Sequence, residues 1–268
     1  MFKKCLKYDL RAVWKVWWIL AVSVTGLCIV GSLGLRFFIQ NVSMGEEPVS
    51  TPIMIGSIFA MLLFIASIIA LIAFVVVTFI LVYYRYYKNL FTDEGYLTFT
   101  LPVGTHSILL SSLVSSAVNL IAVGAVACVS LVLMGLCVIP SMEVLKQGLN
   151  LIWQEFPAIW EKITQTEFLQ ILGLFLENVV TTFASELVLI MLAVTIGSLA
   201  AKKHKILAAF AFCYILHVAI FTVSGIALVN LADTPEGVLG FWSAINLVIA
   251  VVGYFLMYFL VDKKLNLN

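Results

Sequence analysis

The chain has 268 residues, of which 63% are hydrophobic and only 11% are charged. A soluble globular protein needs more polar surface than this, so the composition excludes a soluble domain and indicates an integral membrane protein. The net charge of +1 is uninformative by itself, whereas the distribution of charge along the chain is informative.

Residues 1–16 are predicted to form an amphipathic helix that lies in the membrane surface. Leu6, Leu10 and Val13 recur at helical spacing, and basic residues recur every four positions on another face, from Lys3 to Lys15. Such a helix presents its apolar stripe to lipid and its basic stripe to anionic headgroups. The alternative is a short basic tail without a surface role.

Six stretches are long and apolar enough to cross the hydrocarbon core, which requires about 20 residues of helix. Their predicted limits are residues 17–39, 55–83, 108–139, 172–200, 206–229 and 239–261. Aromatic residues near the start of the first span and at the end of the second suit the headgroup level, so we predict membrane-interface anchors rather than a ligand cage. These anchors are Trp14, Trp17, Trp18, Tyr83, Tyr84, Tyr86 and Tyr87.

The loop at residues 84–107, between the second and third spans, contains an acidic stretch followed by an apolar one. Thr92 can cap a short helix, and Asp93 and Glu94 then lie in its first turn, where the helix dipole favours acids. Pro102 ends this helix. Its apolar face, which suits a protein surface or the membrane, consists of Leu90, Leu97 and Leu101. The alternative is a loop that packs only against its own bundle.

The third span begins with Thr105 as a plausible N-cap, and its first turns carry small polar residues at helical spacing. Small residues four apart allow helices to approach closely in lipid, so we expect this face to pack against another helix. A polar lining for a translocation pathway is the sharper alternative. The residues concerned are Ser111, Ser112, Ser115, Ser116 and Asn119.

Residues 141–171 form the longest connection and keep helical spacing of apolar residues. One or two short amphipathic helices are predicted there, on or in the outer leaflet, with Pro157 breaking or kinking the segment. No separate soluble domain, internal repeat or low-complexity tract is evident. We therefore predict a single transmembrane permease domain over residues 1–268.

Two spans contain ionisable side chains that need an explanation, because a charge near the bilayer centre costs about 2.5–3.5 kcal/mol on insertion scales. Glu186 lies within the fourth span and His217 within the fifth, so His217 is a possible partner for Glu186. Both a structural pairing and a role in a translocation pathway fit these residues. Glu177, which is closer to the end of its span, is expected to be solvated.

Sequence signatures of enzymes are missing: there is no P-loop, no dinucleotide-binding glycine motif, no zinc-protease motif and no nucleophile elbow. The three histidines carry no carboxylate or cysteine at ligand spacing, so no metal site is predicted. We expect no nucleic-acid partner and no cofactor bound by this chain.

Twelve of the fifteen Lys and Arg residues fall on one side of the six predicted spans, in the two terminal segments and in the second and fourth connections. Lys and Arg in short loops stay in the cytoplasm, so both termini are predicted to be cytoplasmic and residues 141–171 extracellular. The expected location is a bacterial plasma membrane, crossed several times.

The loop and the start of the third span resemble a family pattern. Glu94-Gly95-x-Leu97, then Leu101-Pro102-Val103-x-Thr105 and Ile108-Leu109-Leu110, are similar to a motif of permease subunits of ABC-2-type ATP-binding-cassette transporters, especially small six-span ones from Gram-positive bacteria. The match covers about 20 residues, and the six-span layout agrees over the whole chain. The chain departs from the pattern at His106 and at Ser111-Ser112.

The resemblance implies an all-α polytopic membrane protein whose 84–107 loop carries a coupling helix for a separately encoded ATPase. That partner would bind ATP and Mg²⁺, and the permease would dimerise with itself or a related subunit in membrane lipid. The coupling residues that the resemblance implies are Glu94, Gly95, Leu97, Leu101 and Pro102, and Asp93 in the first turn of the same short helix is predicted with them.

The expected cargo of such a permease is amphipathic, such as a peptide antibiotic or a lipid-like molecule, because few fixed charges could hold a polar solute. One rival reading is a stand-alone secondary transporter or channel that uses Glu186 and His217. Another is a non-transporting membrane subunit for immunity or sensing. The chain is not expected to be an enzyme itself.

Overall fold

The protein is helical throughout the part described by a computed structural model, with no strand among those residues. The structure describes residues 2–43, 51–92, 94–95, 100, 104–139, 141–163, 166–201, 203–231 and 234–264. Six helices are long and apolar enough to cross a membrane, which confirms the prediction of a multi-pass membrane protein. Each of the six predicted spans corresponds to one of these helices.

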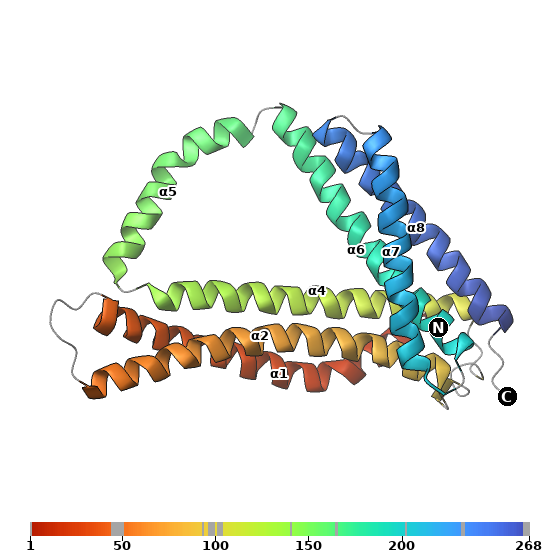
Figure 1. The fold of residues 1–268 in the computed structure, drawn as a ribbon, viewed down its shortest axis with the longest axis horizontal. Coiled ribbons are helices and arrows are strands. Elements are labelled where there is room, and N and C mark those ends of the chain that lie inside the picture. The colour runs from red at the N-terminus through yellow and green to blue at the C-terminus, as the bar shows by residue number, and fades with distance from the viewer. Residues whose placement is uncertain are drawn as a thin grey trace. The chain divides into compact units, whose positions relative to one another are not determined.

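The helices are drawn in chain order from red to blue in Figure 1. The first three candidate spans lie in α1 (Phe2–Phe38), α2 (Thr51–Phe91) and α4 (Thr105–Val138), and a short π-helix, Ile39–Ser43, follows α1. The last three lie in α6 (Thr166–Ala200), α7 (Lys205–Leu231) and α8 (Pro235–Lys264). Between the two sets, in chain order, comes α5 (Met142–Ile163), which is amphipathic.

Two of these helices differ from the sequence-based expectation. The leader is helical, but it continues into the first span as one helix, because no Pro or Gly interrupts the chain between Phe2 and Thr25. Helix α5 is a single helix of 22 residues that contains Pro157, so Pro157 does not break the segment, and the alternative of a kink stays a prediction. Pro157 frees only the carbonyl of Trp153, and this stretch of α5 is exposed, so solvent can satisfy that group.

The contacts divide the chain into two compact parts, each assembled from stretches that are distant in sequence. We call them the terminal part, which includes both chain ends, and the middle part. The terminal part consists of Met1–Asp9, Val82–Ala117 and Trp160–Asn268, and the middle part of Leu10–Leu81 and Val118–Ile159. Whether both parts belong to a single permease domain, as predicted from the sequence, is not tested by this division.

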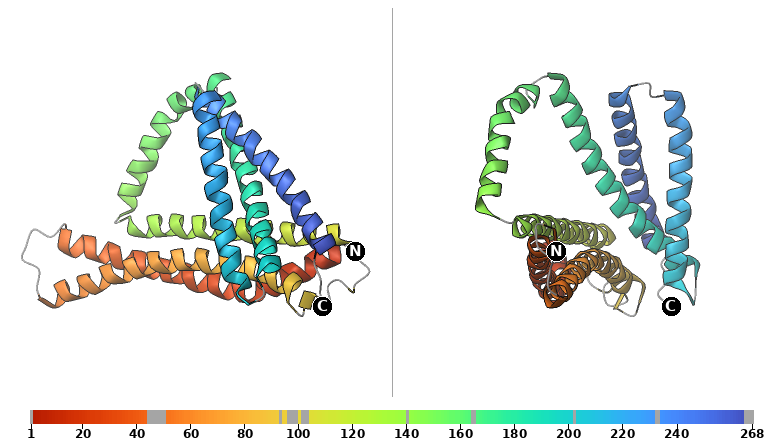
Figure 2. Two further views of the ribbon diagram at one scale, coloured as in Figure 1. Left: turned by 45° about the vertical axis from the view of Figure 1, so that its right-hand side comes forward. Right: turned by 60° about the vertical axis from the view of Figure 1, so that its left-hand side comes forward.

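Within the middle part, α1, α2 and α4 run side by side (Figures 1 and 2). Small residues let α1 and α2 approach closely: a Cβ on Gly34 would lie 2.8 Å from the carbonyl oxygen of Ala60. The three helices share two hydrophobic clusters. The first consists of Trp17, Ala21, Phe74 and Val123, and the second of Cys28, Leu71 and Met134.

Within the terminal part, α6 is the central helix and packs against both α7 and α8, which touch each other much less. A Cβ on Gly197 of α6 would collide with the backbone of Ala209 at the start of α7. On the other side of α6, a Cβ on Gly253 of α8 would lie 2.8 Å from Val188 Cγ1. Gly197 has no room for a side chain because backbone atoms occupy the space, whereas a methyl group at Gly253 would require Val188 to shift.

Candidate functional site: the loop after α2 and the polar contacts around it

The chain turns back on itself immediately after α2. The hydroxyl of Thr92 donates to the carbonyl of Lys88 at 2.6 Å, so it closes the end of α2 instead of capping the next helix. Gly95 N donates to the carbonyl of Thr92 at 2.8 Å, and Glu94 and Gly95 are helical. A Cβ on Gly95 would lie 2.5 Å from the carbonyl oxygen of Leu90, so this reversal has room only for glycine.

An ion pair ties this turn to α2. Lys88 Nζ lies 2.7 Å from Glu94 Oε1, and both side chains are about half exposed. The pair adds little stability at such exposure, but it orients the acidic side chain next to the helix end. Of the six predicted coupling residues, Glu94 and Gly95 are therefore placed. The other four, Asp93, Leu97, Leu101 and Pro102, lie outside the described residues.

The end of α2 also contacts the chain's leader. Asp9 on α1 accepts a hydrogen bond from Asn89 Nδ2 at 3.0 Å and lies 3.5 Å from Arg85 Nη2. The Ser111 hydroxyl on α4 interacts with the same carboxylate. Burial raises the pKa of Asp9 above its usual range, and the charge of Arg85 only partly opposes this. Sequence reasoning missed Asp9, although a single acid within a basic leader was a usable signal.

Helix α7 begins beside the end of α2. Its first residue, Lys205, donates from Nζ to the carbonyl of Phe91 at 3.3 Å, where that carbonyl belongs to the last turn of α2. A cation at a helix C-terminus is favoured by the helix dipole and satisfies a carbonyl that has no partner within the helix.

The start of α4 is bound to the end of α8 by two neighbouring residues. Thr105 Oγ1 donates to Asp262 Oδ1 at 3.1 Å, and Gly104 provides the first carbonyl of α4 in place of the expected Thr105 cap. His106 stacks on Tyr258 at 3.8 Å between ring centroids, and its Nδ1 lies 3.1 Å from the hydroxyl of Tyr254. His106, where the chain departs from the family pattern, therefore has a structural role between α4 and α8.

Three of the predicted membrane-interface anchors are instead buried in the protein. Tyr86 is 1% exposed, and its hydroxyl lies 2.9 Å from Thr195 Oγ1 on α6. Tyr83 and Trp17 are also buried, the latter in the first cluster of the middle part. Burial among helices excludes contact with headgroups. Trp14, Trp18 and Tyr84 are exposed and Tyr87 is partly exposed, and for these four residues the role of membrane-interface anchor stays a prediction.

The polar face at the start of α4 is buried, as the small-residue spacing predicted. Ser111, Ser112, Ser115, Ser116 and Asn119 are all buried, and Ser116 Oγ donates to the carbonyl of Ser112 at 2.8 Å. Burial agrees with the packing interpretation of this face. The role of Asn119 in a pathway stays a prediction.

Glu186 and His217 are brought together by the packing of α6 on α7. His217 Nε2 lies 2.8 Å from Glu186 Oε2, so the pairing considered from the sequence is confirmed. The side chains are 37% exposed for His217 and 46% exposed for Glu186. Glu177, in contrast, is exposed and lies nine residues before Glu186 on α6.

A second polar contact, which the sequence did not indicate, joins α6 to α8. Asn246 donates to Thr182 Oγ1 at 2.8 Å and accepts from Ser185 Oγ at 3.3 Å. Single asparagines and hydroxyls within spans are too common to mark such a network before the register between two helices is known. These residues hold the two helices together, and we assign them no catalytic or binding role.

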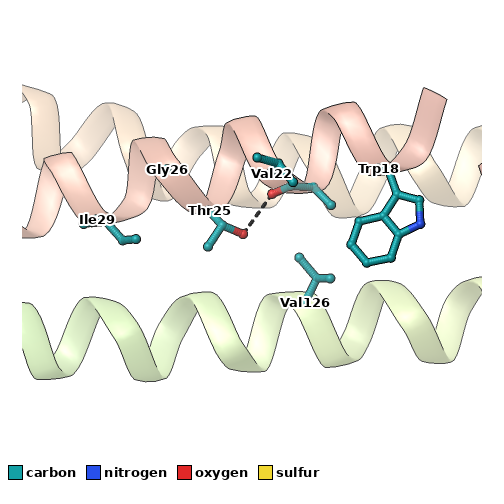
Figure 3. A pocket seen from close by; sticks show the side chains of 7 residues that line it. Trp18, Val22, Thr25, Gly26, Ile29 and Val126 are labelled. Carbon is teal, nitrogen blue, oxygen red and sulfur yellow. Dashed lines mark hydrogen bonds between the residues drawn. The ribbon is translucent and has the colours of Figure 1, made fainter. Parts of the chain in front are cut away.

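The middle part contains an open groove of about 330 Å³ between α1 and α4 (Figure 3). Its lining is apolar except for Thr25, whose hydroxyl donates to the carbonyl of Ala21 at 2.8 Å and lies 3.1 Å from Ser130 Oγ. The groove carries no charge that could select a ligand. The other labelled lining residues are Trp18, Val22, Gly26, Ile29 and Val126.

Comparison of the chain with protein-family models, with curated proteins and with solved structures found no match. The class of protein therefore rests on the fold alone: among the described residues it is a helical membrane protein with six candidate spans. The family resemblance of the 84–107 loop stays a prediction. Among the described residues, no group of His, Cys, Asp and Glu is arranged to hold a metal ion.

Proposed function

We propose that this chain is the transmembrane permease subunit of an ABC transporter, driven by a separately encoded ATPase that docks on residues 93–102. The permease would work as a dimer in a bacterial plasma membrane. It would export an amphipathic or lipid-like cargo, such as a peptide antibiotic. Three observations support this function: the six candidate spans, the family pattern of the loop and the lack of a nucleotide-binding motif in the sequence.

The observation that carries the proposal is the way in which the loop after α2 is tied to the surrounding helices. Glu94 is paired with Lys88 of α2, and Gly95 lies against the backbone of Leu90. The adjoining end of α2 receives Lys205 of α7 and contacts Asp9 of α1. A partner that displaces this loop would therefore act on several spans at once, which is what coupling to an ATPase requires.

The other end of the loop supports the same conclusion. Where the chain enters α4, Thr105 and His106 contact Asp262 and the two tyrosines of α8. Both ends of the loop are thus attached to spans that lie far apart in sequence. A docked ATPase could move the two sets of helices relative to the membrane and so alternate the access of the cargo site.

The test is co-purification in mild detergent, with the ATPase identified by mass spectrometry and its activity measured. We expect an ATPase to accompany the wild-type chain, and Glu94→Ala and Leu97→Asp to weaken its retention and the cargo-stimulated ATP hydrolysis. Lys88→Ala is the matched control, because it breaks the ion pair with Glu94 but leaves the acid in place. Glu236→Ala, an exposed acid at the start of α8, controls for charge.

Two outcomes would count against the proposal, and they differ. If no ATPase accompanies the wild-type chain, the transporter assignment is wrong. If Glu94→Ala and Leu97→Asp retain the ATPase with unchanged coupled activity, the partner is right but the docking site lies elsewhere.

A further inference from the structure

Each nitrogen of the His217 ring has its own oxygen partner. Nδ1 lies 2.8 Å from the backbone carbonyl oxygen of Cys213, one helical turn earlier on α7. Nε2 lies 2.8 Å from Glu186 Oε2 on α6. The ring is therefore held from both sides, by its own helix and by the neighbouring helix.

The number of protons in this arrangement follows from the chemistry of the partners. A carbonyl oxygen can only accept, so Nδ1 carries a hydrogen. A neutral imidazole has a single N–H, which would leave Nε2 as a bare acceptor facing a carboxylate oxygen. Two acceptors do not remain 2.8 Å apart, so a second proton lies between Nε2 and Oε2.

We propose that Glu186 and His217 form a proton-binding site within the membrane-spanning part of the protein, which holds one exchangeable proton between Nε2 and Oε2. The proton completes either an imidazolium–carboxylate pair or a neutral imidazole–carboxylic acid pair. In both forms the occupied site has no net charge. When the proton leaves, the site carries a charge of −1.

The position of the site makes this difference in charge consequential. At 1.5 Å per residue, His217 lies about 18 Å along α7 from Lys205, and Glu186 about 21 Å along α6 from Ala200. A hydrocarbon core is about 30 Å thick, so both residues lie well inside it. An uncompensated anion is strongly disfavoured there, so the proton leaves when water or a cation can reach the carboxylate. The partly exposed side chains leave room for such access.

Among the described residues, the Tyr83 hydroxyl and the Cys213 thiol also face the pair, and neither replaces the proton. Tyr83 of α2 is buried close to Glu186 and Cys213. The Cys213 thiol lies 3.6 Å from His217 Nδ1. A thiol that donated to Nδ1 would leave that nitrogen's lone pair facing the Cys213 carbonyl at 2.8 Å, so the geometry favours a protonated Nδ1.

The site can be examined in the full-length chain alone, in lipid nanodiscs, so the test does not depend on the ATPase. The chain has three histidines, and incorporation of ¹⁵N-histidine makes their ring nitrogens visible by NMR. His106→Gln and His204→Gln would assign the remaining signals to His217 without altering the pair. We expect Nδ1 of His217 to stay protonated throughout a pH titration, while the Nε2 signal reports loss of a single proton.

Two variants on α6 test the role of the carboxylate. Glu186→Gln should lower the proton affinity of His217 by roughly 10-fold or more, because a carboxylate at this distance favours the protonated ring. Glu177→Gln, on the same helix but exposed and nine residues away from Glu186, should leave the titration unchanged. Cys213→Ala should also leave Nδ1 protonated, because the backbone carbonyl remains.

The proposal would be overturned by an unprotonated Nδ1 in the wild-type protein, a result that needs no change at Glu186. It would equally be overturned if Glu186→Gln folds and His217 titrates as in the wild type. If Glu186→Gln does not fold, the NMR signals of the wild-type protein alone still show whether Nδ1 of His217 is protonated.

Discussion

At the scale of single residues, tertiary contacts show that several predicted membrane-interface aromatic residues are buried in the protein. Tyr83, Tyr84, Tyr86 and Tyr87 have the composition of a headgroup belt, but helical periodicity turns Tyr83 and Tyr86 toward other helices and leaves Tyr84 on the outside. Residue type alone cannot distinguish these cases, because Tyr is stable both at a membrane interface and in a protein core with a hydrogen-bond partner.

Replacing Tyr86 with Phe should destabilise the protein by roughly 0.6–1.7 kcal/mol, the average and the largest value from double-mutant cycles on hydrogen bonds between membrane helices. The Thr195 hydroxyl already donates to the carbonyl of Met191, so this replacement would leave the Thr195 oxygen without a donor. Tyr84→Phe is the matched control and should change stability little, because Tyr84 is exposed. Thermal unfolding in detergent measures both, and an equal loss in the two variants would contradict the prediction.

Asp9 should make the stability of the protein depend on pH. Burial raises its folded-state pKa above the ordinary value of 3.8, so its favourable contribution is fully present below that value and is lost as the pH rises through the folded-state pKa. Asp9→Asn should therefore flatten the decline in stability that begins as the pH rises above 3.8. Unfolding temperatures across this range test the prediction, with Glu236→Gln as an exposed control. An unchanged profile in Asp9→Asn would refute it.

At the scale of elements, the type and order of the spans followed from hydropathy, whereas their packing depended on a few small residues. Hydrophobic runs cannot show which faces of two helices meet, because nearly every face is apolar in a membrane protein. The close approach of α6 and α7 at Gly197 and that of α1 and α2 at Gly34 became visible only in the structure.

Gly197→Ala should loosen the contact between α6 and α7 and cost about 1–3 kcal/mol, as overpacking does in other cores. The added methyl would collide with the backbone of Ala209, which cannot move aside as a flexible side chain could. Gly173→Ala, on the same helix, is the matched control, because nothing lies within 4 Å of its Cβ position. Unfolding in detergent should show a loss for Gly197→Ala alone, and equal stability of the two variants would exclude the close approach.

At the scale of the whole molecule, contacts within the terminal part bring together the start of α1, the end of α2, the starts of α4 and α7 and the end of α8. Most of the Lys and Arg residues fall in these segments, which favours a cytoplasmic location for this end.

A membrane-impermeant maleimide should distinguish the two sides in a cysteine-free background. Gly148→Cys on α5 should be labelled in intact cells, and Lys203→Cys between α6 and α7 should be labelled only after the membrane is permeabilised. Both positions are exposed, so a difference in labelling reports the side and not burial. Labelling of Lys203→Cys from outside would reverse the proposed orientation.

The sequence by itself determined the class of the protein. A chain that is 63% hydrophobic and has six long apolar runs cannot cover its apolar surface in water. It also singled out the loop after α2, although the steric reason for Gly95 came from the structure, and it identified Glu186 and His217 as residues that need partners. Each of these features depends on composition, hydropathy or a local backbone constraint, which are properties of neighbouring residues.

Only the tertiary structure decided which distant residues meet. The contact between His217 and Glu186, the burial of Tyr86 against Thr195, and the position of Asp9 beside Arg85 and Asn89 all depend on the rotation and register of one helix against another. Those quantities are set by the packing of many small contacts, and no short stretch of sequence records them. The proton that Glu186 and His217 share follows from this packing, because it requires two oxygens placed on opposite sides of one ring.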